Sequence, residues 1–494
     1  MNRRGETGSL VRGHRALGLL LTVIALPAYA QIGAISSQSL FFDQASNAHL
    51  GNYLAAEGGL IYTDNVDQTR GGPGDTLAML GLLGNASGNR PRFDYRLASD
   101  IALVKYLHSS FQTQPFGYLD GSAEVKIVPG LFSWTGRETY SQAVLNPFLP
   151  VTPDNLENLS YLTTGPRLTL RPTLRTTITV DGTYSYLISS SKSPLYVNID
   201  NHRYGGDITL SRAFTNTTSV YITGSSEKVE FTDQVDNTNF RQDQAMAGFR
   251  VANARTVLDL SGGYTKAHEV ALATVQTIRG PRALPQNQTP SGGTWQVELS
   301  RLISPRQRVS LRAVKQVAEA ANLFRLGVDQ PVPTTVSNRL VNGQPFTDRE
   351  FGATWRFQAQ RTSLQIDVLD DSQRYRATPA SNRDVKDVSA LFARQLSPVL
   401  NWDIGATYEH SDYALGGSVN TVNALTSLRW RLGERVGLRF IYAHSTLTPH
   451  GYADNQVGVT ASYALAAAGQ AGSQAPEAPA LQPTSPMSAQ PHLQ

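Results

Sequence analysis

The chain has 494 residues, of which 40% are hydrophobic, and its mean hydropathy is −0.26. This balance is too polar for a protein that crosses a membrane with helices, but it suits a membrane barrel, whose strands are only half apolar. The sequence has no cysteine, which excludes disulfides, thiolate metal sites, cysteine nucleophiles and a lipoprotein attachment cysteine. The formal net charge of +4 is small for this length and predicts no nucleic-acid partner.

Residues 1–30 have the features of a secretory signal peptide. Four arginines precede an apolar run from Ala16 to Leu26, and Ala28-Tyr29-Ala30 supplies small residues for a cleavage site. The alternative is an uncleaved anchor, but the run is shorter than the ~20 residues that span a bilayer. We therefore expect cleavage near Ala30. Residues 31–50 show no sustained periodicity and are predicted to be a periplasmic lead-in.

Strands are predicted from residue 51 to residue 465, and the stretch from Ser427 to Tyr442 shows their pattern most clearly. Apolar and aromatic residues such as Trp430 and Phe440 alternate with arginines on both sides of the turn Gly433-Glu434-Arg435. Alternation with a period of two places the two sets on opposite faces of a strand. The apolar face would point inward in a soluble sandwich, but it would face lipid in a membrane barrel.

The connections between these strands alternate between two lengths. Short ones lie at 128–130, 171–174, 214–217, 253–255, 304–307 and 397–398, and longer polar ones at 189–202, 231–242, 269–292, 321–348, 372–386 and 413–420. Short periplasmic turns and long extracellular loops are typical of outer-membrane barrels. We predict an all-β, transmembrane, antiparallel up-and-down β-barrel of about twenty strands, with eighteen as the alternative because residues 100–140 look irregular. Residues 466–494 are rich in Ala, Pro and Gln and are predicted to be a disordered tail.

Two sets of charged side chains share the polar phase of the predicted strands. They would be costly on a buried face but are at ease on a water-filled wall. We predict that they line a pore, where they set selectivity or bind an acidic polysaccharide; alternatively, they are simply solvated and paired across strands. The predicted pore-lining residues are Arg167, Arg312, Arg429, Arg431, Arg439, Asp181, Asp259, Glu298, Asp367, Asp403 and Glu409. A barrel this wide either conducts or is narrowed by loops, such as 269–292 and 321–348, that fold inward.

The sequence contains no recognisable catalytic or cofactor motif. His268-Glu269 begins like a zinc-protease motif, but Leu272 occupies the position of the second histidine. Asp64, Asn65 and Asp67 could ligate Ca²⁺, although a turn-forming acidic loop is the favoured interpretation. We therefore expect no catalytic residues, no cofactor and no metal, and the chain is not predicted to be an enzyme.

Tyr62-Thr63-Asp64-Asn65-Val66, the strand from Gly165 to Leu170 and the closing strand from Gln456 to Leu465 resemble the β-barrel porin 2 family. The resemblance covers residues 51–465 and implies a location in the Gram-negative outer membrane and an association with exopolysaccharide production. The expected function is a passive conduit for exopolysaccharide or another surface glycan. A general diffusion porin and a structural or adhesive barrel are the alternatives. Expected partners are outer-membrane lipid and lipopolysaccharide, the barrel assembly machinery and exopolysaccharide export components.

Overall fold

The computed structural model describes residues 53–109, 111–146, 148–190, 198–233, 237, 239–269, 274–277, 280–283, 290–319, 344–376, 379–448 and 451–466. The predicted signal peptide and lead-in lie outside these residues, as does the predicted tail beyond Ala466. Within the described residues, no helix is long and apolar enough to cross a membrane.

Twenty of the described strands form a single antiparallel sheet, in which each strand pairs with the next one along the chain. The strands are β1 Tyr53–Thr63, β2 Asp75–Asn89, β3 Phe93–Tyr106, β4 Gln114–Val128, β5 Phe132–Val144, β6 Leu156–Thr173, β7 Thr176–Ser189, β8 Asn201–Ala213, β9 Thr218–Phe231, β10 Phe240–Ala252, β11 Thr256–Glu269, β14 Ser291–Ser304, β15 Gln307–Ala318, β16 Phe346–Gln358, β17 Thr362–Tyr375, β18 Arg383–Ser397, β19 Leu400–Tyr413, β20 Gly417–Arg431, β21 Val436–Thr448 and β22 Tyr452–Ala466. Between β11 and β14, β12 Thr274–Thr277 and β13 Gly280–Ala283 pair as a separate hairpin.

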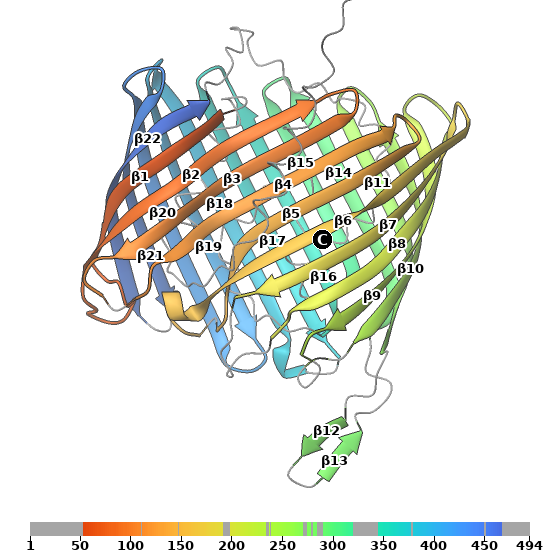
Figure 1. The fold of residues 1–494 in the computed structure, drawn as a ribbon, viewed down its shortest axis with the longest axis horizontal. Helices are drawn as coiled ribbons and strands as arrows, with labels where there is room; N and C mark the ends of the chain where they lie inside the picture. Colours follow the sequence, from red (N-terminus) through yellow and green to blue (C-terminus); the bar gives the residue numbers. More distant parts are fainter. Residues whose placement is uncertain are drawn as a thin grey trace, which may run out of the picture.

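The sheet closes on itself because β1 pairs with β22 as well as with β2. Figure 1 shows the strands running obliquely around the resulting barrel. The predicted fold and the predicted number of about twenty strands are confirmed. The alternative of eighteen is wrong, because β3, β4 and β5 are regular strands of 14, 15 and 13 residues.

The predicted alternation of short and long connections holds along most of the wall. One end of the barrel carries tight turns, such as the one between β20 and β21, and is called the short-turn end. The first residue of β1 and the last residue of β22 also lie there. The opposite end is called the long-loop end. One prediction is wrong: the connection expected at 413–420 is short, because β19 ends at Tyr413 and β20 begins at Gly417.

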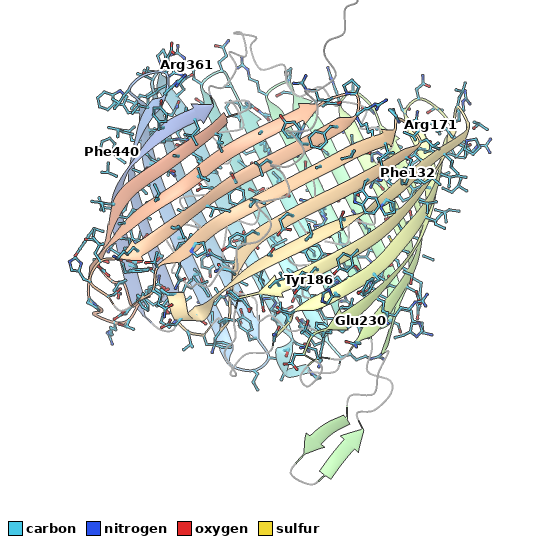
Figure 2. All side chains as sticks on the ribbon, in the orientation of Figure 1. Phe132, Arg171, Tyr186, Glu230, Arg361 and Phe440 are labelled. Carbon is cyan, nitrogen blue, oxygen red and sulfur yellow. The ribbon has the colours of Figure 1, made fainter. Side chains whose placement is uncertain are left out.

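Each strand presents an apolar outer phase and a polar inner phase. In the β20–β21 hairpin, Trp430, Phe440 and Tyr442 are 45%, 42% and 44% exposed, whereas Arg439 is 6% exposed. Figure 2 places Phe440 at the outer edge of the barrel. The buried phase must be the inner one, because its side chains contact residues that belong to, or lie next to, strands that are not their neighbours in the sheet. Such contacts are possible only across the interior.

The seam between β1 and β22 is held by side chains as well as by the backbone ladder. Thr63 Oγ1 donates to Asp454 Oδ1 at 2.5 Å, and Thr460 donates to Glu57. Beyond the seam, Asp64 accepts hydrogen bonds from the backbone and side-chain amides of Asn455, both at 2.8 Å. Asp64 therefore ties its loop to β22, in keeping with the interpretation of residues 64–67 as a turn-forming loop.

The seam gives a stability prediction. A Cβ on Gly59 would lie 2.4 Å from the carbonyl oxygen of Val459 on β22, whereas a Cβ on Gly58 would meet only ordinary contacts of 3.5 Å or more. Gly59→Val should therefore destabilise the folded barrel by roughly 1–3 kcal/mol through overpacking, and Gly58→Val should cost much less. The measurement is the temperature at which the folded band is lost on a detergent gel; equal losses for both variants would contradict the close approach of β1 and β22 at Gly59.

Candidate functional site: the barrel lumen

The inner phase of the wall is largely polar, with apolar patches such as the cluster of Leu391, Leu425, Ile441 and Ala443. The register of the paired strands places all the predicted pore-lining residues on this phase. The β20–β21 hairpin illustrates it, since Arg429 lies opposite Arg439 while Trp430 lies opposite Leu438 on the outer phase. That these residues line a conducting path stays a prediction.

Several of the predicted charges form ion pairs between neighbouring strands. Arg167 Nε lies 2.6 Å from Asp181 Oδ1, and Arg429 Nη2 lies 2.8 Å from Asp403 Oδ2. Arg312 lies between two acids, with Nη1 2.5 Å from Glu350 Oε1 and Nε 3.5 Å from Glu298 Oε1. Pairing across strands, the alternative interpretation of the pattern, therefore describes these groups well.

Four of the remaining predicted residues are held by hydrogen bonds along the wall, and Arg439 is buried on the inner phase of β21. Asp259 accepts from the Tyr221 hydroxyl at 2.6 Å, and Asp367 accepts from Thr354 Oγ1 at 2.7 Å. Glu409 accepts from Ser411 Oγ at 2.8 Å. Arg431 is exposed at the short-turn end, where Nη2 donates to a backbone carbonyl at 3.1 Å. Networks of this kind hold charged groups in fixed positions on a wall.

The connection between β5 and β6, residues 145–155, folds into the barrel at the long-loop end. It ends in a single turn of 3₁₀ helix, η1 Pro153–Asn155. The side chain of Asn155 closes the loop: Oδ1 accepts from the Asn146 backbone N–H, and Nδ2 donates to the carbonyls of Asn146 and Pro150. Without these bonds the backbone groups of an inward loop would lack partners.

Apolar contacts fix this loop against strands that are not its neighbours. The ring of Phe148 lies 4.9 Å from that of Tyr413 on β19, edge to face, next to Val419 and Leu447. On the other side, Val151 packs against a buried cluster that includes Leu77 of β2. Figure 1 shows the yellow segment after β5 turned towards β19 to β21, as these contacts require. The loop therefore lies across part of the lumen.

A second contact crosses the interior where β15 ends. The guanidinium of Arg203 on β8 binds the carboxylate of Glu319 through two bonds, at 2.5 and 2.6 Å, and both side chains are almost fully buried. Gln242 Nε2 on β10 donates to the carbonyl of Val317 at 3.3 Å. Because β8 and β10 are not neighbours of β15, the chain turns inward as it leaves β15. The predicted inward folding of 321–348 is not tested, because residues 320–343 lie outside the described residues. Half of 269–292 lies outside them as well, and the β12–β13 hairpin within that range projects away from the barrel instead of folding into it (Figure 1).

The sequence interpretation did not identify the 145–155 loop as part of the lumen. A signal was present: Leu145, Phe148, Leu149 and Val151 make the segment too apolar for a solvated extracellular loop. Among the described residues, no group of three His, Cys, Asp or Glu side chains could hold a metal ion. His268 lies on the outer phase of β11, 3.7 Å from Asp243 across the neighbouring strand.

The closed sheet, its apolar outer phase and its polar inner phase define a transmembrane, antiparallel up-and-down β-barrel. No described protein family matches the chain, and no curated protein matches it significantly. The predicted membership in the β-barrel porin 2 family therefore stays a prediction.

Solved structures of other barrels resemble it in architecture. A siderophore receptor, PirA of Pseudomonas aeruginosa, is 9% identical over 84% of this chain and 80% of its own, with a TM-score of 0.41. A BenF-like porin of Pseudomonas fluorescens Pf-5 is 8% identical over 84% and 99%, with a TM-score of 0.36. OccAB4 of Acinetobacter baumannii is 9% identical over 84% and 97%, with a TM-score of 0.36.

The inward loop gives a prediction for passage through the lumen. Phe148→Ala removes the half-buried ring that packs on Tyr413. This should cost less than the ~3–5 kcal/mol of a fully buried phenylalanine but release the loop from β19. We expect a larger single-channel conductance in planar bilayers. Leu149→Ala is the matched control, because Leu149 lies in the same loop and is 44% exposed. An unchanged conductance for Phe148→Ala would mean that the loop does not narrow the path.

Proposed function

We propose that the protein is an outer-membrane conduit through which hydrophilic cargo passes passively. The observation that carries this proposal is the inner wall rich in polar and charged side chains, opposite an apolar outer wall, around the closed sheet. Charges such as Asp181 and Asp403 would be very costly in lipid, but on the inner wall they are paired with Arg167 and Arg429. At this number of strands, the wall side chains alone are too small to fill the interior.

An outer-membrane location accounts for both ends of the barrel. Outer-membrane barrels carry short turns on the periplasmic side and long loops outside, and the predicted signal peptide would bring the chain to the periplasm. Near the long-loop end of the wall, the outer phase carries cationic residues such as Lys315, Arg349 and Lys386. These would face the anionic headgroups of lipopolysaccharide, which supports that lipid as a partner.

The finer proposal is that the cargo is exopolysaccharide or another surface glycan, with the energy for its movement supplied by export components elsewhere. The sequence resemblance supports this cargo. A general diffusion porin for small solutes is the second candidate. It is favoured by the inward loop at 145–155, since a narrowed mouth suits small solutes better than a polymer.

Planar-bilayer recording of the purified, folded protein tests the proposal. We expect discrete conductance steps, because the polar lumen should hold water and ions. Graded neutral dextrans added to one side should block the current if a glycan chain can enter, whereas exclusion of all but small sugars would favour the diffusion porin. Correctly folded protein that produces no conductance would contradict both candidates and favour a structural or adhesive barrel.

A further inference from the structure

The charged side chains of the inner wall are sorted along the barrel axis. Each strand has its own short-turn end, and the described inner-phase residues that pair in register with a neighbouring strand lie at different distances from it. Those seven or more residues from that end form the outer zone, and those within six residues form the basal zone. The division separates the long-loop half of the lumen from the short-turn half.

The outer zone is strongly acidic. It carries eleven acids and two bases. The acids are Asp75, Asp100, Asp120, Glu157, Glu227, Asp348, Glu350, Asp371, Asp387, Glu409 and Asp454, and the bases are Arg203 and Arg383.

The basal zone is slightly basic. It carries eleven bases and nine acids. The bases are Arg96, Lys126, Arg137, Arg167, Arg250, Arg308, Arg312, Arg356, Arg429, Arg431 and Arg439. The acids are Glu57, Asp94, Glu124, Asp181, Asp207, Asp259, Glu298, Asp367 and Asp403.

This sorting belongs to the inner face and does not reflect the composition of the strands. On the outer phase at the same level, bases such as Lys315, Arg349 and Lys386 occur beside acids such as Asp370 and Asp384. Adjacent residues of one strand can therefore carry opposite charges on opposite faces. A solvated rim with no preference would show the same mixture of signs on both faces.

One acid of the outer zone also has spare bonding capacity in a buried position. Asp348 is 4% exposed, and its Oδ2 accepts from Gln316 Nε2 at 3.1 Å. Its Oδ1 has no donor among the described residues, and the acid next to it is Asp371 of β17, which is 2% exposed. Two buried acids side by side are poorly compensated. A cation drawn into the outer zone would supply the missing partner.

We infer that the lumen is an asymmetric electrostatic filter that admits cationic and neutral cargo at its outer mouth and holds back polyanions. The inference rests on the proposed function, and it narrows the glycan class to neutral or cationic chains. Clefts lined by one sign of charge concentrate the opposite ions, so the outer zone gathers cations and the basal zone weakly gathers anions. A voltage that drives cations from the outer zone towards the basal zone, and anions the other way, raises the ion concentration in the lumen. The opposite voltage lowers it.

The current should therefore be larger when the long-loop side is positive, and the reversal potential in a KCl gradient should show a preference for cations. Both effects should be clear at 0.1 M salt, where the Debye length is ~10 Å, and should shrink at 1 M, where it is ~3 Å. Glu434→Cys places a single cysteine in the β20–β21 turn, because the chain has no other. An impermeant thiol reagent added to one side of the bilayer reacts with it only if the short-turn end faces that side, which reports the orientation of the barrel.

Two triple variants on the same three strands form a matched pair. Asp371→Asn with Asp387→Asn and Glu409→Gln neutralises inner acids of β17, β18 and β19, and should reduce both the asymmetry and the cation preference. Asp370→Asn, Asp384→Asn and Asp412→Asn neutralise outer-face acids of those strands, and should change neither. In the basal zone, replacing Arg429, Arg431 and Arg439 by Glu should increase cation preference and weaken the asymmetry.

The outcomes separate the two proposals. Conductance with a larger current at long-loop-positive voltage and a cation preference supports the inference. A conducting wild-type barrel with symmetric currents, or with the opposite asymmetry, overturns the inference and leaves the conduit intact. Equal effects of the inner and outer triple variants would also overturn it. Folded protein with no conductance contradicts the conduit, and with it the inference.

Discussion

The structure depends on one constraint: in lipid, no water is available to bond the backbone, so every N–H and C=O of a strand must find a partner in the sheet. The pairing of β1 with β22 meets that requirement by removing both edges. Closure of an up-and-down sheet with an even number of strands places the first and last strand ends on the same side. It also forces every strand to present one phase outward and one phase to an enclosed space.

The enclosed space determines the rest of the site. Twenty strands make a lumen too wide for wall side chains to fill, and two inward segments partly occupy it. One is the 145–155 loop, which is braced by Asn155 and anchored through Phe148 on β19. The other leaves β15 and is bound by Arg203 across the interior. The same enclosure gives the sorted inner charges their effect, since ions that pass through must meet both zones in series.

Local patterns in the sequence were enough to predict what is local in the fold. Alternation alone placed Trp430 and Phe440 on one phase and Arg429 and Arg439 on the other, and the spacing of turns gave the strand number. The inward contacts were not predictable in this way. Arg203 and Glu319 are far apart in sequence, and nothing in the period of either strand indicates that they meet. The charge zones required the register, because distance from the turn becomes meaningful only once the strand ends are known.

The central claim is that the apolar phase faces lipid and the charged phase faces the interior. Single cysteines placed in turn at residues 437–442 of β21, in a chain that has none, can carry a fluorophore in brominated-lipid bilayers. We predict strong quenching for Leu438→Cys, Phe440→Cys and Tyr442→Cys, and weak quenching for cysteines at residues 437, 439 and 441. Quenching with the opposite phase, or without a period of two, would contradict the account.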